Sequence, residues 1–211
     1  MKTETKNIDR VFKWKTAALM ALAVVSLTAS TALAGDDEDE FKFNMVSSSP
    51  KILPHAQGRV RIESVGPVEI MNVTVWGLPP NTDFDFFVIQ SPVAPFGLSW
   101  YQGDIETNRY GVGFGRFVGR FSIETFIVAP GVVPVPAPTP HPQDASTNPQ
   151  TAPIHTFHLG LWFNSPQDAA KAGFPGNPTP FNGEHNAGVQ VLNTSNFLPK
   201  EGPLFHVKSQ Q

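Results

Sequence analysis

The histidines are the residues whose type is suited to metal chemistry. His158, Glu184 and His185 would together make a zinc or copper ligand set, because these ions take imidazole nitrogens and carboxylate oxygens. His155 lies three residues before His158 on an expected strand, so the two rings point to opposite faces and do not chelate one ion. Glu184 and His185 follow in a Gly- and Asn-rich loop that could approach His158 only through the fold. Solvated loop histidines explain the same residues, so a metal-dependent hydrolase is kept as an alternative.

Two pairs of carboxylates form the second candidate constellation. Asp83 and Asp85 share one face of an expected strand, and Asp104 and Glu106 share a face further along the chain. Both pairs lie near expected loop ends, where β-sandwich proteins can hold calcium. Ordinary solvent-facing strand positions explain them equally well.

Neighbouring aromatic residues form the third constellation. Trp100 and Tyr101 could make a platform on which a sugar ring stacks, with Gln102 and Asp104 as hydrogen-bonding neighbours. Adjacent strand residues face opposite ways, however, which favours Trp100 in the core and Tyr101 on the surface. The chain holds 17 Phe against 4 Trp and 2 Tyr, and this balance favours core packing over sugar binding.

Motifs of common enzyme classes are missing from the sequence. There is no cysteine nucleophile, no Gly-x-Ser-x-Gly elbow, no His-Glu-x-x-His helix and no glycine-rich phosphate loop before a helix. We therefore expect a protein that is not an enzyme and that needs no cofactor.

The first 34 residues have the pattern of a secretory signal peptide. Residues 1–15 hold five basic and two acidic residues, residues 16–34 hold no charge, and the segment ends in Ala32-Leu33-Ala34. This order predicts cleavage between Ala34 and Gly35. An uncut membrane anchor is the alternative, but the Ser and Thr content and the small-residue ending favour cleavage. We expect a secreted, periplasmic or cell-envelope protein with no stable membrane span after cleavage.

The charge and the cysteine content of the cleaved chain limit which classes of partner and which sources of stability are expected. Of the 15 basic and 18 acidic residues, five and two lie in residues 1–34, so 10 basic and 16 acidic residues remain and the net charge is about −6. Nucleic acid is not expected as a partner, because it requires clustered Lys and Arg. With no cysteine there are no disulfides, and stability must come from one hydrophobic core.

The mature chain is expected to contain one folded domain between two loose ends. Residues 35–57 begin with an acidic run and are predicted to be a mostly disordered leader, and residues 198–211 a loose tail. The domain between them, residues 58–197, includes a proline-rich stretch at 129–153 that is predicted to be a long loop.

Within the domain, apolar residues alternate with polar ones in several short segments. The clearest hairpin signal spans residues 69–90, where a Gly- and Pro-rich turn at 77–82 separates two alternating runs. Further strands are predicted at 58–64, 111–128 (one long bent strand or two shorter ones), 155–164 and 188–192. Ser165 and Pro166 open a short helix near 166–172. This order predicts an all-β protein, an antiparallel β-sandwich of immunoglobulin-like type, preceded by the signal helix.

The turn motifs resemble those of secreted bacterial β-sandwich proteins of unknown function. The matching stretches are Gly77-Leu78-Pro79-Pro80-Asn81-Thr82, Gly103-Asp104-Ile105-Glu106-Thr107-Asn108 with Gly111-Val112-Gly113, the strand from His155 to Phe163, and the loop Asn182-Gly183-Glu184-His185-Asn186-Ala187-Gly188. The resemblance covers about residues 58–197 and implies the immunoglobulin-like fold, but no reaction.

These observations predict an exported, non-enzymatic binding or structural module. Its partner would be an envelope protein or an extracellular polysaccharide. The first alternative is a carbohydrate or cell-wall polymer binding protein that uses Trp100 and Tyr101, and the second is the hydrolase described above.

Overall fold

The computed structural model describes residues 40–123, 126–128, 152–179 and 186–208. The chain divides into two compact units, residues 1–35 and 36–211, and the described residues all belong to the second. The predicted signal helix, the cleavage position at Ala34 and Gly35, and most of the proline-rich loop lie outside the described residues.

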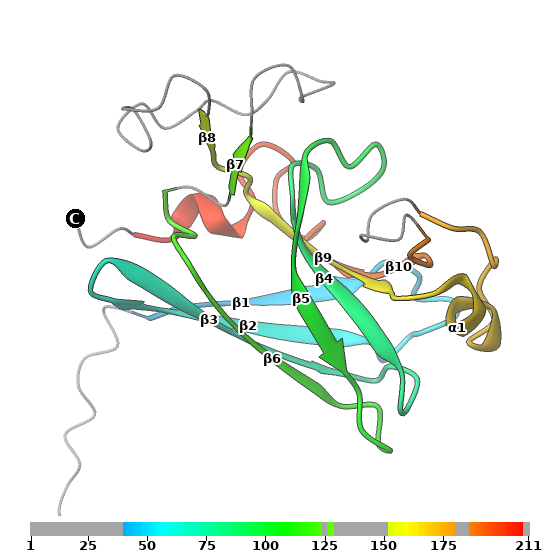
Figure 1. Ribbon diagram of the computed structural model, residues 1–211. Helices are drawn as coiled ribbons and strands as arrows, with labels where there is room; N and C mark the ends of the chain where they lie inside the picture. Colours follow the sequence, from blue (N-terminus) through cyan, green and yellow to red (C-terminus); the bar gives the residue numbers. More distant parts are fainter. Residues whose placement is uncertain (1–39, 124–125, 129–151, 180–185, 209–211) are drawn as a thin grey trace, which may run out of the picture. The chain divides into compact units, whose positions relative to one another are not determined.

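Eight strands form one antiparallel sheet in the order β5-β4-β9-β10-β1-β2-β3-β6 (Figure 1). Their bounds are Glu40–Ser47 (β1), Gln57–Val65 (β2), Val68–Trp76 (β3), Asp83–Ile89 (β4), Ser99–Glu106 (β5), Gly113–Gly119 (β6), His158–Phe163 (β9) and Gln190–Asn193 (β10). A separate two-stranded sheet pairs β7 (Phe126–Val128) with β8 (Ala152–Ile154). The described helices are α1 (Pro166–Lys171) and the 3-10 helix η2 (Pro203–His206). The predicted all-β class is confirmed.

The large sheet folds over into two layers that enclose the core. β1, β2, β3 and β6 form one layer, and β4, β5, β9 and β10 form the other (Figure 1). The core between them contains Val60, Val73, Phe84, Phe86 and Leu161, all fully buried. The two end strands, β5 and β6, lie against each other and share a bridge between Thr107 and Gly113, so the sheet is nearly closed and barrel-like. The immunoglobulin-like arrangement stays a prediction.

The predicted hairpin between residues 69–76 and 83–90 is wrong, although both of its strands exist. β3 pairs with β2 and β6, whereas β4 pairs with β5 and β9. The tight turn at Gly66-Pro67 gives β3 a local partner in β2, with Gly66 at a φ of 61° that favours glycine. The six residues 77–82 contain two prolines and carry the chain from one layer to the other.

Part of the predicted disordered leader is a strand inside the sheet. β1 pairs with β2 on one side and with β10 on the other. Phe43 and Met45 alternate with polar residues and are buried in the core, which offsets the cost of ordering the segment. The prediction is therefore wrong for residues 40–47, while residues 35–39 lie outside the described residues.

The predicted loose tail is also wrong over residues 198–208. η2 places Leu204 and Val207 in the core, and the Leu204 amide donates to the carbonyl oxygen of Phe157 at 3.1 Å. Two apolar residues spaced three apart in a polar segment are a weak sequence signal, and only the distant core gives them a place to be buried.

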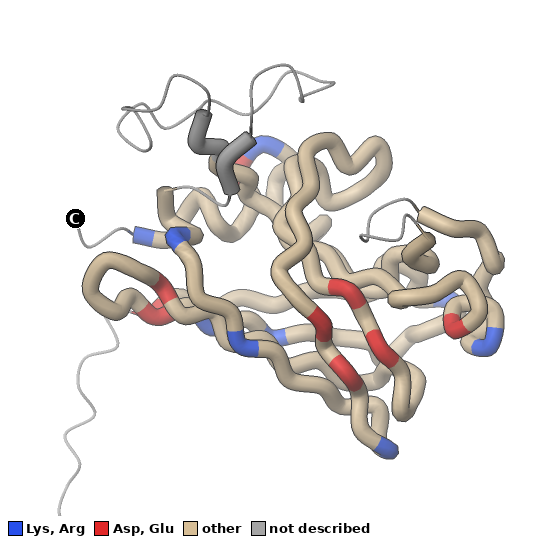
Figure 2. The backbone as a smooth tube through the Cα atoms, viewed as in Figure 1, with Lys and Arg blue, Asp and Glu red and all other residues tan. Residues whose placement is uncertain are grey.

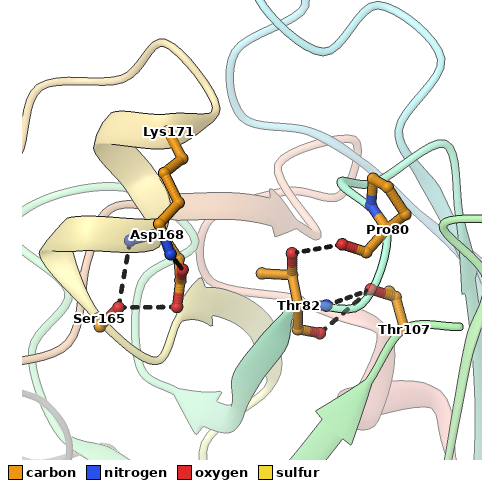
Figure 3. A network of polar contacts seen from close by, with 6 residues as sticks. All are labelled: Pro80, Thr82, Thr107, Ser165, Asp168 and Lys171. Carbon is orange, nitrogen blue, oxygen red and sulfur yellow. Dashed lines mark hydrogen bonds and ion pairs between the residues drawn. The ribbon is translucent and has the colours of Figure 1, made fainter. Parts of the chain in front are cut away.

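Other local predictions are confirmed. The stretch 111–128 contains two shorter strands, β6 and β7, and the strands near 155–164 and 188–192 are β9 and β10. The Ser165 hydroxyl oxygen accepts a hydrogen bond from the Asp168 amide at 3.1 Å and caps α1 as predicted (Figure 3). None of the helices within the described ranges is long and apolar enough to cross a membrane.

Candidate functional site

His158, the first predicted metal ligand, is a fully buried structural residue. Its Nε2 donates to the carbonyl oxygen of Pro199 at 3.1 Å, and its Nδ1 lies 2.9 Å from the hydroxyl of Thr194. Burial lowers the pKa of His158, so the neutral ring is favoured. With both nitrogens hydrogen-bonded, the ring joins β9 to the C-terminal segment.

The other two predicted ligands, Glu184 and His185, lie outside the described residues. Within the described residues, no group of three or more His, Cys, Asp and Glu side chains could hold a metal ion. The predicted set therefore stays a prediction, and the contacts of His158 do not favour it.

Trp100 and Tyr101 lie on opposite faces of β5. In the register with β4, Trp100 is opposite Val88 and Tyr101 is opposite Phe87, which belong to different faces of that strand. Trp100 is 50% exposed, so the prediction that it is a core residue is wrong, whereas Tyr101 is 42% exposed as predicted. Both side chains reach the surface, but not as one flat platform. The Tyr101 ring packs edge-on against Phe87 at 5.6 Å, and its hydroxyl donates to the Asp104 carboxylate.

The two predicted carboxylate pairs meet on the outer face of β4 and β5. The strand register places Asp83 opposite Glu106 and Asp85 opposite Asp104, and directly opposed residues are about 4.5–5.5 Å apart at Cα. The register shifts between Phe86 and Phe87 because Gln102 of β5 is an extra, unpaired residue, and this bulge leaves the two carboxylate pairs aligned. We call these four residues the acidic face (Figure 2). The sequence indicated each pair, but it did not reveal that the pairs are neighbours.

The acidic face has the electrostatics of a site that favours positive charge. Partial burial, then the charge of Asp104, raise the pKa of Asp83 above its usual value. Hydrogen bonds from the Phe84 amide at 3.1 Å and the Asn164 side chain at 3.2 Å offset part of this shift. Burial, followed by the hydrogen bond to Asp104, also raises the pKa of Tyr101, which keeps the phenol protonated. A bound cation would relieve the repulsion among the carboxylates.

A buried aromatic cluster borders the acidic face. Trp162 packs edge-on against Phe87 at 5.4 Å and against Phe96 at 5.0 Å, and it lies opposite Asp85 in the register between β9 and β4. Gly160 makes room for the indole, because a Cβ there would lie 2.3 Å from Trp162 Cζ3. Sequence reasoning placed Trp162 on an alternating strand and missed this cluster, since its partners come from a different strand and a loop. The cluster packs β4 against β9 on the same outer face as the carboxylates.

Comparison of the chain with models of known protein families finds no match. Comparison with curated protein sequences finds no match either. The chemistry of the acidic face is therefore interpreted from its own residues.

Proposed function

We propose that this protein is an exported, non-enzymatic binding module of the cell envelope or the extracellular space, and that its acidic face binds a ligand carrying ammonium or guanidinium groups. The observation that carries this proposal is the register of β4 and β5, which places Asp83 opposite Glu106 and Asp85 opposite Asp104. The absence of nucleophile and metalloprotease motifs from the sequence supports a binding role over a catalytic one.

The physical basis is the repulsion among like charges held on a rigid sheet. The strands fix the carboxylates before any ligand arrives, so binding does not require the backbone to be ordered. Asp104 and Glu106 are exposed and available to a ligand, while Asp85 is almost fully buried beneath them. A cation at this face replaces repulsion with attraction.

Tyr101 widens the range of suitable ligands. Its ring is 42% exposed beside Asp104, so a ligand cation could contact the aromatic face as well as the carboxylate. The ammonium groups of an amine-bearing polysaccharide could contact both the Tyr101 ring and the Asp104 carboxylate. The carbohydrate-binding alternative is therefore retained for polysaccharides of this kind. Lysine-rich protein segments carry the same ammonium chemistry.

The experiment compares the purified protein with one variant and one matched control. Binding of a hexalysine peptide is measured by calorimetry at low ionic strength for the wild type, Glu106→Gln and Glu201→Gln. Both substitutions remove one exposed carboxylate, but only Glu106 belongs to the acidic face. We expect Glu106→Gln to weaken binding roughly two- to fivefold, the usual range for one exposed ion pair.

Calcium and a chitosan oligosaccharide are titrated in parallel, to distinguish a metal ion and an amine-bearing polysaccharide from a lysine-rich peptide as ligands. Equal peptide affinity in the two variants would contradict the proposal. Binding that is insensitive to salt would also contradict it, because exposed charge pairs are screened at high ionic strength.

A further inference from the structure

The outer face of β1, β2, β3 and β6 carries the opposite charge to the acidic face. Strand registers align Lys42, Arg61, Asn72 and Arg116 in one row across the four strands. The adjacent row consists of Asn44, Arg59, Thr74 and Phe114. The four cations of the two rows, Lys42, Arg59, Arg61 and Arg116, are all exposed, and we call them the basic face.

Two carboxylates balance part of this charge. Glu40 forms ion pairs with Lys42 and Arg61, and Glu63 lies 2.5 Å from Arg61. Arg59 and Arg116 have uncharged neighbours in the register, namely Asn44 and Thr74 for Arg59 and Asn72 for Arg116. Four cations against two carboxylates leave the basic face with a net positive charge.

Exposed apolar side chains accompany the cations on β6. Phe114 is 61% exposed and Val118 is 60% exposed, on either side of Arg116. An exposed combination of Phe, Val and Arg on one strand is typical of a protein contact surface. On the other layer, Tyr101 supplies an exposed aromatic ring beside the acidic face.

The two charged faces lie on different layers, and these layers meet where β5 and β6 pack together. The core lies between the layers, so the outer face of each layer is turned outward on its own side. Figure 2 shows four acidic positions gathered on the β4 and β5 pair, whereas the other layer carries basic positions together with acidic positions at the β2 and β3 hairpin.

We propose that the basic face docks onto the acidic face of a second copy of this chain, so that copies associate head to tail. This inference rests on the proposed function and names its partner: the guanidinium and ammonium groups bound by the acidic face are those of another copy. Charge complementarity identifies this occupant, and both complementary surfaces belong to the same chain. Because the contact joins two different surfaces, it produces an open chain of copies unless a rotation closes it into a ring.

The test uses two variants, each blocked at one face. Asp104→Asn with Glu106→Gln neutralises part of the acidic face, and Arg59→Gln with Arg116→Gln neutralises part of the basic face. All four residues are exposed; the Asn and Gln replacements of the carboxylates keep the side-chain shape, and the Gln replacements of the arginines are shorter but still polar. Circular dichroism and thermal unfolding check that both variants keep the wild-type fold. If either double variant unfolds early, Glu106→Gln and Arg116→Gln alone replace the pair.

Sedimentation velocity measures association over a wide range of protein concentration, at low and high ionic strength. We expect the wild type to form species whose mass keeps growing with concentration at low salt and falls at high salt. Each variant alone should remain a monomer. An equimolar mixture should form a one-to-one dimer and nothing larger, because each variant retains one intact face.

Three results would overturn the inference. A wild type that stays monomeric at low salt while still binding hexalysine would refute the self-association and leave the proposed function standing. A wild type that stops at a dimer, with each variant alone forming the same dimer, would refute the head-to-tail arrangement. Association that neither variant weakens would show that other surfaces carry it. If the wild type does not bind hexalysine, the proposed function itself is refuted.

Discussion

Thr107 follows β5, and its side chain forms hydrogen bonds with the segment 77–82 that connects β3 to β4. Its side chain is 2% exposed, its hydroxyl donates to the carbonyl oxygen of Pro79 at 2.7 Å, and its oxygen accepts from the Thr82 amide at 3.0 Å (Figure 3). The substitution Thr107→Val keeps the shape of the side chain and removes both hydrogen bonds. The amide and the carbonyl then lose their partner in a largely buried position.

The magnitude follows from these two contacts. Each hydrogen bond contributes about 1 kcal/mol, and a buried group left without a partner costs somewhat more, so we expect Thr107→Val to lower the free energy of unfolding by about 2–3 kcal/mol. For a domain of this size, 1 kcal/mol corresponds to roughly 2–4 °C, which predicts a Tm lower by roughly 4–12 °C. Thermal unfolding followed by circular dichroism measures the shift.

Thr82→Val is the matched control. The Thr82 hydroxyl donates to the carbonyl oxygen of Pro80 at 3.0 Å in an exposed position, where water replaces the lost partner. We expect the control to cost about 0.5 kcal/mol or less. If Thr107→Val lowers the Tm no more than Thr82→Val does, the crossing segment is held by something other than this hydroxyl, and the reasoning is refuted.

Three further predictions concern the pH dependence, the sheet interior and export. Burial lowers the pKa of His158 in the folded protein, so the unfolded chain binds its proton more readily. The contribution of the neutral ring to the free energy of unfolding is therefore complete above pH 6.5, the ordinary pKa of histidine, and is lost as the pH falls below that value. Urea unfolding at a series of pH values measures this loss. The substitution Gly103→Ala should destabilise the protein by about 1–3 kcal/mol, because φ is 151° and the new Cβ would lie 2.9 Å from Phe117 Cε1, as thermal unfolding would show. Expressed in a bacterium, the exported protein should begin at Gly35 by intact mass spectrometry, and Ala34→Asp should leave the leader attached.

For each of these three predictions, one result would contradict it directly. His158→Gln should flatten the dependence of stability on pH, and an unchanged dependence in this variant would refute the role of the buried ring. Gly66→Ala separates backbone strain from crowding, since φ is 61° but nothing lies within 4 Å of its Cβ; an equal loss at both glycines would refute the contact with Phe117. Recovery of an uncleaved wild-type chain from the cell envelope would favour a retained membrane anchor.

Local patterns predicted much of the secondary structure. The alternation of Val60 and Ile62 with charged neighbours identified β2, and the Ser165-Pro166 start identified α1. Such signals are readable because side-chain period and capping depend only on neighbouring residues. Asp83 and Asp85 were also placed correctly on one face by the same period.

The neighbours of each strand could not be predicted in this way. The hairpin predicted between β3 and β4 failed because turn residues show where the chain bends, but not across which edge the next strand pairs. The segment that forms β1 was predicted to be disordered because of the acidic run before it. The prediction failed because pairing with β2 and β10 buries Phe43 and Met45, and this pairing cannot be read from the segment itself. The loose tail failed for the same reason.

The sequence by itself determined the all-β class, the positions of most strands and the expectation of export. The tertiary structure alone decided that Asp83 meets Glu106 and that Asp85 meets Asp104, and it left Trp100 half exposed although the alternation had favoured a core position. The physical reason is that the alternation of side chains is a property of a single extended backbone, whereas register and layer depend on which distant segments bury one another's apolar faces. The acidic face consequently exists only in the folded sheet.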